Sequence, residues 1–433
     1  TMKALDFCPR NLQHLQLILE GGERADGSSL FPKMGVDVTK SDVVLRPRLE
    51  TAFLHPFADK TLAVLCDHAT FEGELLDVSP STIVKRAFDY TAKAVSPEGA
   101  TDPTYLYAHG EIEYFLGIDA SKLPGSAQDR NKDVGYHATT PFVFGEDLRR
   151  SAQIILTEMG VDIKYAHSEC GHAQTQRVGG TVWEQHEVEL SLAPLPKAAD
   201  GAVLTMWVIA TLAAQQGMMC SFEPVVCPGH AGSGMHFHMS PVTLAGDQIV
   251  HAPQRQHGTL TKSFQQLIAG LSVTSGALMA FGNRKLSSFV RITQGKEAPS
   301  VVFWGDRNRK ALIRLPMVAF TGDGRQVAPA TVEYRLGDGS ALPHLLLAGI
   351  ALSFAHGVSM GTAAVEERVR RTEAAEAAKD PASLEPVPKS FLEIRQQLTR
   401  HRGIFENKGG VFSTAFLDSQ LAYLEEMARE QKD

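Results

Sequence analysis

Apolar residues recur at helical spacing in several stretches of the chain. Near the N-terminus Leu12, Leu15, Ile18 and Leu19 form one apolar face, and Gly21-Gly22 marks its end. The same spacing predicts helices over residues 81–94, with Ser81 as N-cap, and over 148–159, 199–216, 342–357, 363–379, 392–399 and 414–431. The two most apolar runs, 202–214 and 345–355, are shorter than a membrane span requires, so we expect buried core helices there.

Short apolar runs broken by Pro and Gly predict strands of a small sheet between residues 43 and 78. The turn-rich segment Ser96-Pro97-Glu98-Gly99 follows. We therefore expect a small N-terminal domain with its linker over 1–98. A large domain in which strands and helices alternate is expected over 99–433.

Four segments each place two ionisable side chains two positions apart: Glu111-Ile-Glu113, Glu187-Val-Glu189, His236-Phe-His238 and Glu333-Tyr-Arg335. In a strand, such positions share a face. One interpretation is that these are the solvent-facing sides of edge strands, because alternation is normal in half-buried strands. Gathered on one face, however, carboxylates repel unless a cation neutralises them, and hard divalent cations prefer oxygen ligands with an occasional imidazole. The pattern thus predicts a Mg²⁺ or Mn²⁺ site on a sheet.

Composition narrows the class of protein. The net charge is −7, from 42 basic and 49 acidic residues, which argues against a nucleic-acid partner. The five cysteines show no CxxC spacing, so a disulfide framework or zinc knuckle is not expected. No signal-peptide pattern is present. We expect a cytoplasmic protein that binds neither nucleic acid nor membrane.

In their order along the chain, these segments resemble the glutamine synthetase family. The most specific match is Gly232-Ser-Gly-Met-His236-Phe-His238-Met-Ser240. The other matching segments are Asp26-Gly-Ser-Ser29, Glu111-Ile-Glu113, His167-Ser-Glu169, Gln185-His-Glu187, Gly295-Lys-Glu297-Ala-Pro299, Asn308 to Pro316 and Glu333-Tyr-Arg335. The resemblance implies an α+β fold. A small, shortened N-terminal β-grasp-like domain would precede a catalytic domain with a curved antiparallel sheet, flanking helices and a helical C-terminus.

The resemblance also implies an activity and its ligands. The enzyme would be a carbon–nitrogen ligase that joins ammonia to the side-chain carboxylate of glutamate, using ATP and a γ-glutamyl phosphate intermediate. Two or three Mg²⁺ or Mn²⁺ ions would lie in each site. The protein would form a homo-oligomer, hexamer or dodecamer, with active sites shared between neighbouring subunits.

By carry-over onto matching positions, the site residues fall into four groups. One ion would bind Glu113, Glu169 and Glu187, and the other Glu111, His236 and Glu333. Glutamate would bind Arg291, Arg335 and the backbone at Gly232, while ATP would lie against His238, Ser240, Arg314 and Arg309. Ammonium would lie near Asp26, Ser29, Tyr136 and Glu169, with Glu297 shielding the intermediate from water.

Several positions depart from the family pattern. His230-Ala231 stands where Asp-Asn is usual, Lys164 replaces an acid, Ala328 and Thr331 replace basic residues, and the loop over 170–183 is longer. Two alternatives therefore remain: a γ-glutamyl ligase for another amine such as methylamine or a polyamine, and a catalytically weak structural or regulatory relative. Retention of Asp26 and Tyr136 favours ammonia. Asp26 has a simpler alternative role, capping the turn before Gly27.

Overall fold

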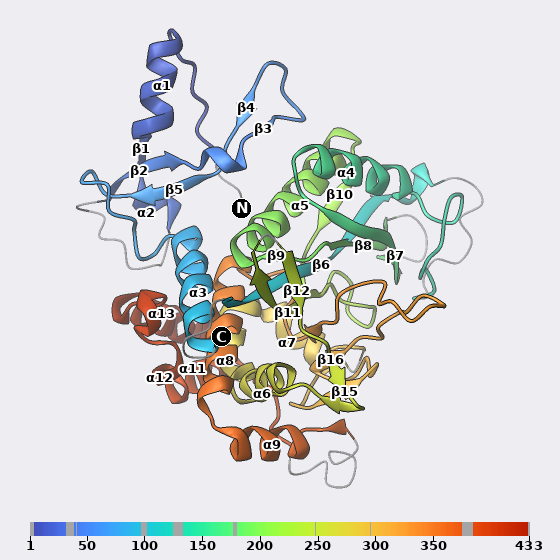
Figure 1. The fold of residues 1–433 in the computed structure, drawn as a ribbon. Coiled ribbons are helices and arrows are strands. Elements are labelled where there is room, and N and C mark those ends of the chain that lie inside the picture. Colours follow the sequence, from blue (N-terminus) through green and yellow to red (C-terminus); the bar gives the residue numbers. More distant parts are fainter. Residues whose placement is uncertain are drawn as a thin grey trace.

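The N-terminal region of the chain forms a small sheet below a projecting helix and a hairpin beside that helix (Figure 1). The computed structural model describes residues 4–31, 39, 41–96, 102–123, 133–175, 180–246, 248–294, 296–374 and 384–431. The elements here are α1 (Leu12–Gly21), β1 (Glu23–Asp26), α2 (Gly27–Leu30), β2 (Asp42–Pro47), a 3-10 turn (Leu49–Thr51), β3 (Phe53–Leu54), β4 (Leu62–Ala63) and β5 (Cys66–Ala69). One sheet has the order β1-β2-β5, and β3 pairs with β4. The helix and the sheet that the sequence predicted are both present.

Helix α3 (Pro80–Val95) runs from this region to the large part of the chain (Figure 1). Its N-cap is Ser79, so the prediction of Ser81 as cap was wrong. Pro80 explains the earlier start, because proline has no amide hydrogen to lose and its φ suits a first helical turn. Residues 97–99 of the predicted linker lie outside the described residues.

A large sheet organises the rest of the molecule. Its strands are β6 (Thr104–Asp119), β7 (Ile163–Gln174), β8 (Thr181–Leu190), β9 (Ala193–Pro194), β10 (Met219–Ser221), β11 (Met235–Ala245), β12 (Gln248–His251), β15 (Trp304–Asp306), β16 (Ile313–Leu315) and β17 (Val332–Tyr334). The main order is β15-β16-β17-β11-β6-β8-β7. All these pairs are antiparallel except β15–β16, which is parallel. The predicted α+β class is confirmed, with this one parallel pair added.

Helices cover the sheet and form the C-terminal region (Figure 1). They are α4 (Glu146–Glu158), α5 (Leu195–Gln215), α6 (Lys262–Gly282), α7 (Leu286–Thr293), α8 (Pro343–Ser359), α9 (Thr362–Arg371), α11 (Phe391–Arg400), α12 (Arg402–Phe405) and α13 (Thr414–Glu430). Smaller elements are the β13–β14 hairpin (Arg255–Gln256 and Thr259–Leu260) and 3-10 turns at Ala120–Lys122 and Lys408–Gly410. The predicted helix over 363–379 ends at Arg371, and its last five positions lie outside the described residues.

Sequence periodicity did not predict α6, which is buried along most of its length. A helix surrounded by protein has no polar face, so its apolar residues show no clear period. Polar side chains inside it bond to the helix itself: Thr274 and Ser275 donate to the carbonyls of Gly270 and Leu271. By length and composition, α5 and α6 are each apolar enough to cross a membrane, yet 56% and 78% of their most apolar windows are buried inside the protein. Both are core helices here.

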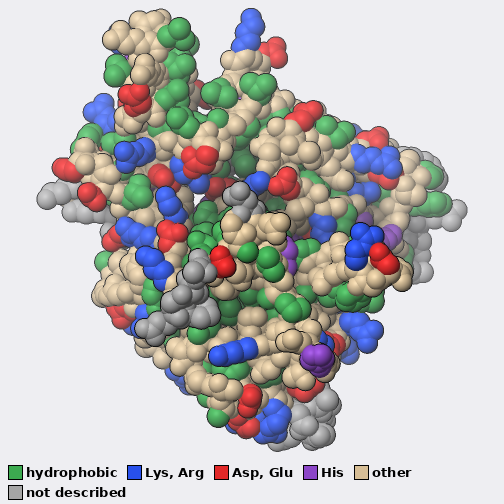
Figure 2. Space-filling model, viewed as in Figure 1, with side chains coloured by type: hydrophobic (Ala, Val, Ile, Leu, Met, Phe, Trp, Pro, Cys, Tyr) green, Lys and Arg blue, Asp and Glu red, His purple; other side chains and the backbone are tan. Residues whose placement is uncertain are grey.

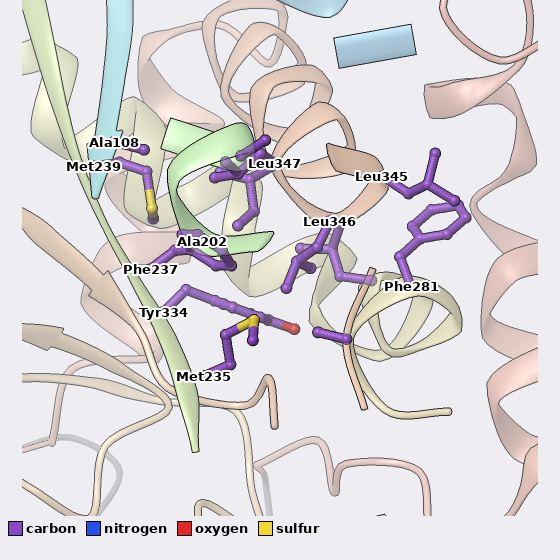
Figure 3. Packing of buried hydrophobic residues seen from close by; sticks show 14 of the residues in the cluster. Ala108, Ala202, Met235, Phe237, Met239, Phe281, Tyr334, Leu345, Leu346 and Leu347 are labelled. Carbon is purple, nitrogen blue, oxygen red and sulfur yellow. The ribbon is translucent and has the colours of Figure 1, made fainter. Parts of the chain in front are cut away.

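Strand β11 presents opposite chemistry on its two faces. Met235, Phe237 and Met239 are completely buried and lie with Leu345 and Leu346 of α8 in the core (Figure 3). Because side chains alternate along a strand, His236 and His238 must face the other side of the sheet. The hydrophobic core thus dictates the direction of the polar side chains.

The N-terminal region exposes apolar side chains. Helix α1 has no buried residue, and Leu12, Leu54 and Leu62 are 85%, 79% and 57% exposed. Patches of hydrophobic side chains lie on the projecting α1 in Figure 2. Apolar surface gathered in this way is typical of a protein–protein interface.

His68 in β5 is expected to make the unfolding free energy depend on pH. Burial lowers its pKa from 6.5 to about 4, with Asp67 and Arg48 nearby, and its Nδ1 lies 2.8 Å from Ser79 Oγ. Below pH 6.5 His68 is protonated in the unfolded chain but stays neutral in the folded chain. The free energy of unfolding therefore falls as the pH falls towards 4. The loss should be about 2 kcal/mol between pH 7.5 and 5. Urea unfolding of wild type and His68→Gln at both pH values measures it; an identical pH dependence in the two proteins would contradict the assignment.

Candidate metal and ligand site

The strand registers bring the predicted polar pairs face to face. Glu111 and Glu113 of β6 lie opposite Glu189 and Glu187 of β8. On the other side of β6, Glu111 lies opposite His236 of β11. Glu111, Glu187, Glu189, His236, His238, Glu333 and Arg335 are all at most 9% exposed. The interpretation that these are solvent-facing positions on edge strands is therefore wrong.

A first cluster consists of Glu111, His236 and Glu333. Ligand atoms from all three lie within 4.8 Å of one another. His236 Nδ1 is 3.0 Å from Glu111 Oε2 and 3.7 Å from Glu333 Oε1. These are the three residues that the resemblance grouped around one ion.

A second cluster consists of His167, Glu169 and Glu187, whose ligand atoms also lie within 4.8 Å. The resemblance grouped Glu113 with Glu169 and Glu187. Glu113 adjoins both clusters: its Oε1 is 3.8 Å from His236 Nδ1, and its Oε2 accepts hydrogen bonds from Gln185 and the Gly234 amide. His167 was not among the predicted site residues, although it lies two positions before Glu169 and would share its face in a regular strand.

Glu169 occupies an irregular part of β7. The β7–β8 register shifts between Ser168 and His172, which places Glu169 at a bulge. Bulges redirect side chains and recur beside active sites. Gly171 is needed here, since a Cβ would lie 2.6 Å from Gln185 Oε1. A long loop was predicted over 170–183, but β7 continues to Gln174 and β8 begins at Thr181. Residues 176–179 between them lie outside the described residues.

A third group contains His109 and Lys164, which were not predicted as site residues, together with Glu189 and His238, which belong to the predicted polar pairs. His109 Nε2 lies 2.8 Å from Glu189 Oε1, Lys164 Nζ lies 2.5 Å from the same oxygen, and the His109 ring stacks on His238 at 4.5 Å. His238 Nε2 lies 2.8 Å from Glu111 Oε1, and His238 Nδ1 lies 3.0 Å from Thr331 Oγ1. The signal for His109 was present, because the alternation of Glu111-Ile-Glu113 extends two residues upstream to it.

The acids of this site have displaced pKa values. Burial, reinforced by the charges of Glu111 and Glu113, raises the pKa of Glu187 well above its usual range. Burial likewise raises the pKa of Glu113 and Glu169. For Glu111 the effect of burial is outweighed by His238 and His236, which hold its pKa well below its usual range. Carboxylates this close and this buried are neutralised well by a divalent cation, and the oxygen-rich donor set with imidazole fits Mg²⁺ or Mn²⁺.

Arginines line the same face. Arg314 Nη1 and Arg335 Nη1 donate to the two oxygens of Glu333 at 2.8 and 2.6 Å. Arg291 Nη2 lies 3.2 Å from His236 Nε2, and a Cβ at Gly232 would meet the Arg291 side chain at 3.1 Å. Arg309 Nη1 is 3.9 Å from Glu297 Oε2. Ser240 is buried, with Oγ 3.5 Å from His251 Nδ1.

The residues predicted around ammonium fall into two sets. Tyr136 stacks on His137 at 4.2 Å and meets the His167 ring edge-on at 5.3 Å, with Arg309 5.8 Å above its ring, so it lies at the site. Asp26 instead caps α2: it accepts hydrogen bonds from the Ser28 amide and from the hydroxyls of Ser28 and Ser29. The capping role is thus present, and the Ser41 side chain is a further hydrogen-bond partner of Asp26.

Comparison with known proteins matches this geometry to one family. The model of the glutamine synthetase catalytic domain matches residues 79–432. A glutamine synthetase from Methanococcus maripaludis is 29% identical over 410 residues, covering 91% of this chain and 84% of the relative. A solved complex of GmaS (γ-glutamylmethylamide synthetase) with ADP has a TM-score of 0.74 at 17% identity, covering 97% of this chain and 89% of that one. A structure described as a novel glutamine synthase homolog has a TM-score of 0.72 at 18% identity, covering 97% and 90%.

Fold and site therefore define a ligase. The chain belongs to the glutamine synthetase family, whose members are ATP-dependent γ-glutamyl ligases.

Proposed function

We propose that this protein joins ammonia to the side-chain carboxylate of glutamate at the expense of ATP. In the first step a carboxylate oxygen of glutamate attacks the γ-phosphorus of ATP, ADP leaves, and γ-glutamyl phosphate forms. In the second, ammonia attacks the acyl carbon and phosphate leaves, while a nearby base takes the proton. The observation that carries the proposal is the pair of carboxylate–imidazole clusters, one buried and one partly buried, beside Arg291, Arg309, Arg314 and Arg335.

Divalent ions, Mg²⁺ or Mn²⁺, are proposed to be held by Glu113, Glu169 and Glu187 and by Glu111, His236 and Glu333. When bound, they neutralise phosphate charge and align the reacting groups. His167 lies 3.3 Å from Glu187, so it is a candidate additional ligand or hydrogen-bond partner.

The arginines are proposed to bind the two anionic substrates. Arg291, Arg335 and the backbone at Gly232 would hold glutamate, while Arg309 and Arg314, with His238 and Ser240, would face the nucleotide. Both Arg314 and Arg335 are paired with Glu333 in this structure. A carboxylate shared between two guanidinium groups leaves several of their donors for an incoming anion.

The nucleophile is proposed to enter beside Tyr136 and Glu169. Ammonium must lose a proton before it attacks, and an acid beside a desolvated site both attracts the cation and accepts the proton. Glu297, next to Arg309, would shield the acyl phosphate from water. Asp26 and Ser29 would reach this site from a neighbouring subunit.

One observation favours an organic amine as second candidate. The rings of Tyr136, His137 and His167 lie close together, with ring centroids 4.2 to 5.3 Å apart. Ring faces attract alkylammonium groups as well as ammonium. The solved GmaS structures, similar in fold, bear the name of a methylamide-forming enzyme.

Phosphate release distinguishes these functions. Purified protein with ATP, Mg²⁺ or Mn²⁺ and glutamate is expected to release phosphate faster with ammonium than with methylamine or a polyamine, and to form glutamine in equal amount. A preference for an organic amine would replace the first proposal by the second. No glutamate-dependent release with any amine would contradict both and support a catalytically weak relative.

We also propose that the protein works as a cytoplasmic homo-oligomer, a hexamer or a dodecamer. The exposed leucines of α1 and of the β3–β4 hairpin supply apolar surface for such contacts. Sharing of the site between subunits is proposed because Asp26 lies in the N-terminal sheet region, whereas the acids lie on the large sheet.

A further inference from the structure

Asp133 joins three segments that are far apart in the sequence. Its Oδ1 lies 3.2 Å from His230 Nδ1 and accepts the His172 amide at 3.3 Å. Its Oδ2 lies 3.2 Å from Lys296 Nζ. The Asp133 side chain is only 15% exposed, so it is enclosed by these partners. It thereby links β7, the loop before β11 and the segment after α7.

The backbone that carries Asp133 is fixed on β7. The Gly135 amide donates to the Cys170 carbonyl, and the His137 amide donates to the Ser168 carbonyl. Ser168 Oγ donates in turn to the Ala138 carbonyl at 2.7 Å. Gly135 permits this approach, because a Cβ there would lie 2.8 Å from the Glu169 carbonyl oxygen. The chain is therefore held against β7 from Gly135 onwards, two residues after Asp133.

The segment after α7 contacts both the loop before β11 and Asp133. Gln294, the C-cap residue of α7, accepts from the Gly229 amide at 2.8 Å and donates to the His230 carbonyl at 3.4 Å. Two residues later, Lys296 reaches Asp133. In this chain His230 stands where the family usually has an acid, and the carboxylate facing the loop comes from Asp133 instead.

Glu297 follows Lys296 directly, and its side-chain and carbonyl contacts with the described residues are long. Its carboxylate is 3.9 Å from Arg309 Nη1 and is 66% exposed. Its carbonyl accepts from Arg335 Nη2 at 3.5 Å. Contacts of this length restrain a side chain weakly. The closest side-chain ion pair beside Glu297 is that of Lys296 with Asp133, at 3.2 Å.

We propose that Asp133 is a positioning residue that acts through Lys296 to hold Glu297 beside Glu169 and Arg309. Its catalytic consequence rests on the proposed function: with Glu297 in place, water is kept from γ-glutamyl phosphate. Because the ion pair is half-exposed on the lysine side, its strength falls with ionic strength.

The experiment compares Asp133→Asn, Lys296→Met and the double variant with wild type. Asparagine keeps the volume and an oxygen for the His172 amide but removes the charge. Asp162→Asn is the matched control, since it removes the charge of an exposed pair with Lys197 at 2.8 Å. The first readout is amide hydrogen exchange of peptides covering 296–303, which requires no activity. The second is the phosphate released per amide formed.

Both single variants are expected to speed exchange in 296–303 severalfold and to raise the ratio of phosphate to amide severalfold, with the control unchanged. The double variant should add nothing, because both changes break one contact. Asp133→Glu should restore part of the coupling. Unchanged exchange in Asp133→Asn, or fully additive effects, overturns the positioning role. If wild type shows no glutamate-dependent phosphate release while exchange still rises, the proposed function fails and the contact stands.

Discussion

Glu113→Ala is expected to lower turnover about a thousandfold and to weaken Mn²⁺ binding. The Glu113 carboxylate adjoins both clusters, through His236 at 3.8 Å and through its position opposite Glu187. Losing it removes one negative charge where divalent ions would be held, and metal stabilisation of a transferring phosphoryl group is worth several kcal/mol. Calorimetric titration with Mn²⁺ and steady-state turnover measure the two effects.

Glu425→Ala serves as the control for this change. Glu425 lies on α13, where it pairs with Arg429 and Arg395 near the surface. It loses the same charge but should leave metal affinity and turnover unaltered. If Glu113→Ala binds Mn²⁺ and turns over like wild type, the metal assignment is wrong.

Asp26→Asn is expected to raise the KM for ammonium about thirtyfold while the KM for glutamate changes little. The neutral amide of asparagine lacks the charge that attracts the ammonium cation, whereas the groups proposed to bind glutamate are unchanged. Asparagine is chosen because it caps a helix as well as aspartate does, so α2 keeps its N-cap and only the charge is lost. Asp26→Ala removes both.

The two variants separate the roles of Asp26. Equal increases in the ammonium KM support a direct role in binding the cation. An effect confined to Asp26→Ala would show that Asp26 acts only as a cap. Mixing the Asp26→Asn and Glu113→Ala proteins tests the shared site: activity should partly return through mixed interfaces, and no recovery between mixed subunits would argue that each site is built from one chain.

Much of the site was predictable because its residues follow strand alternation. Pairs such as Glu111 and Glu113 share a face in any extended strand, and the apolar residue between them must face the core. The same alternation places His109, two positions before Glu111, on the same face of β6. Periodicity does not predict the direction of Glu169, because a bulge interrupts the alternation of β7 there. It does not predict α6 either, because a helix buried on all sides has no alternation of polar and apolar faces.

Local pattern by itself determined the helices with one apolar face and the direction in which the acids and histidines point, whereas the α+β class followed from the resemblance to the family. The first two properties follow from backbone geometry that each segment carries independently of its neighbours. Only the tertiary structure decided which acids meet. Strand register sets Glu111 against Glu189 and His236, and loop packing sets Asp133 against Lys296. Register and loop packing depend on the free energy of the whole core, so no single segment contains them.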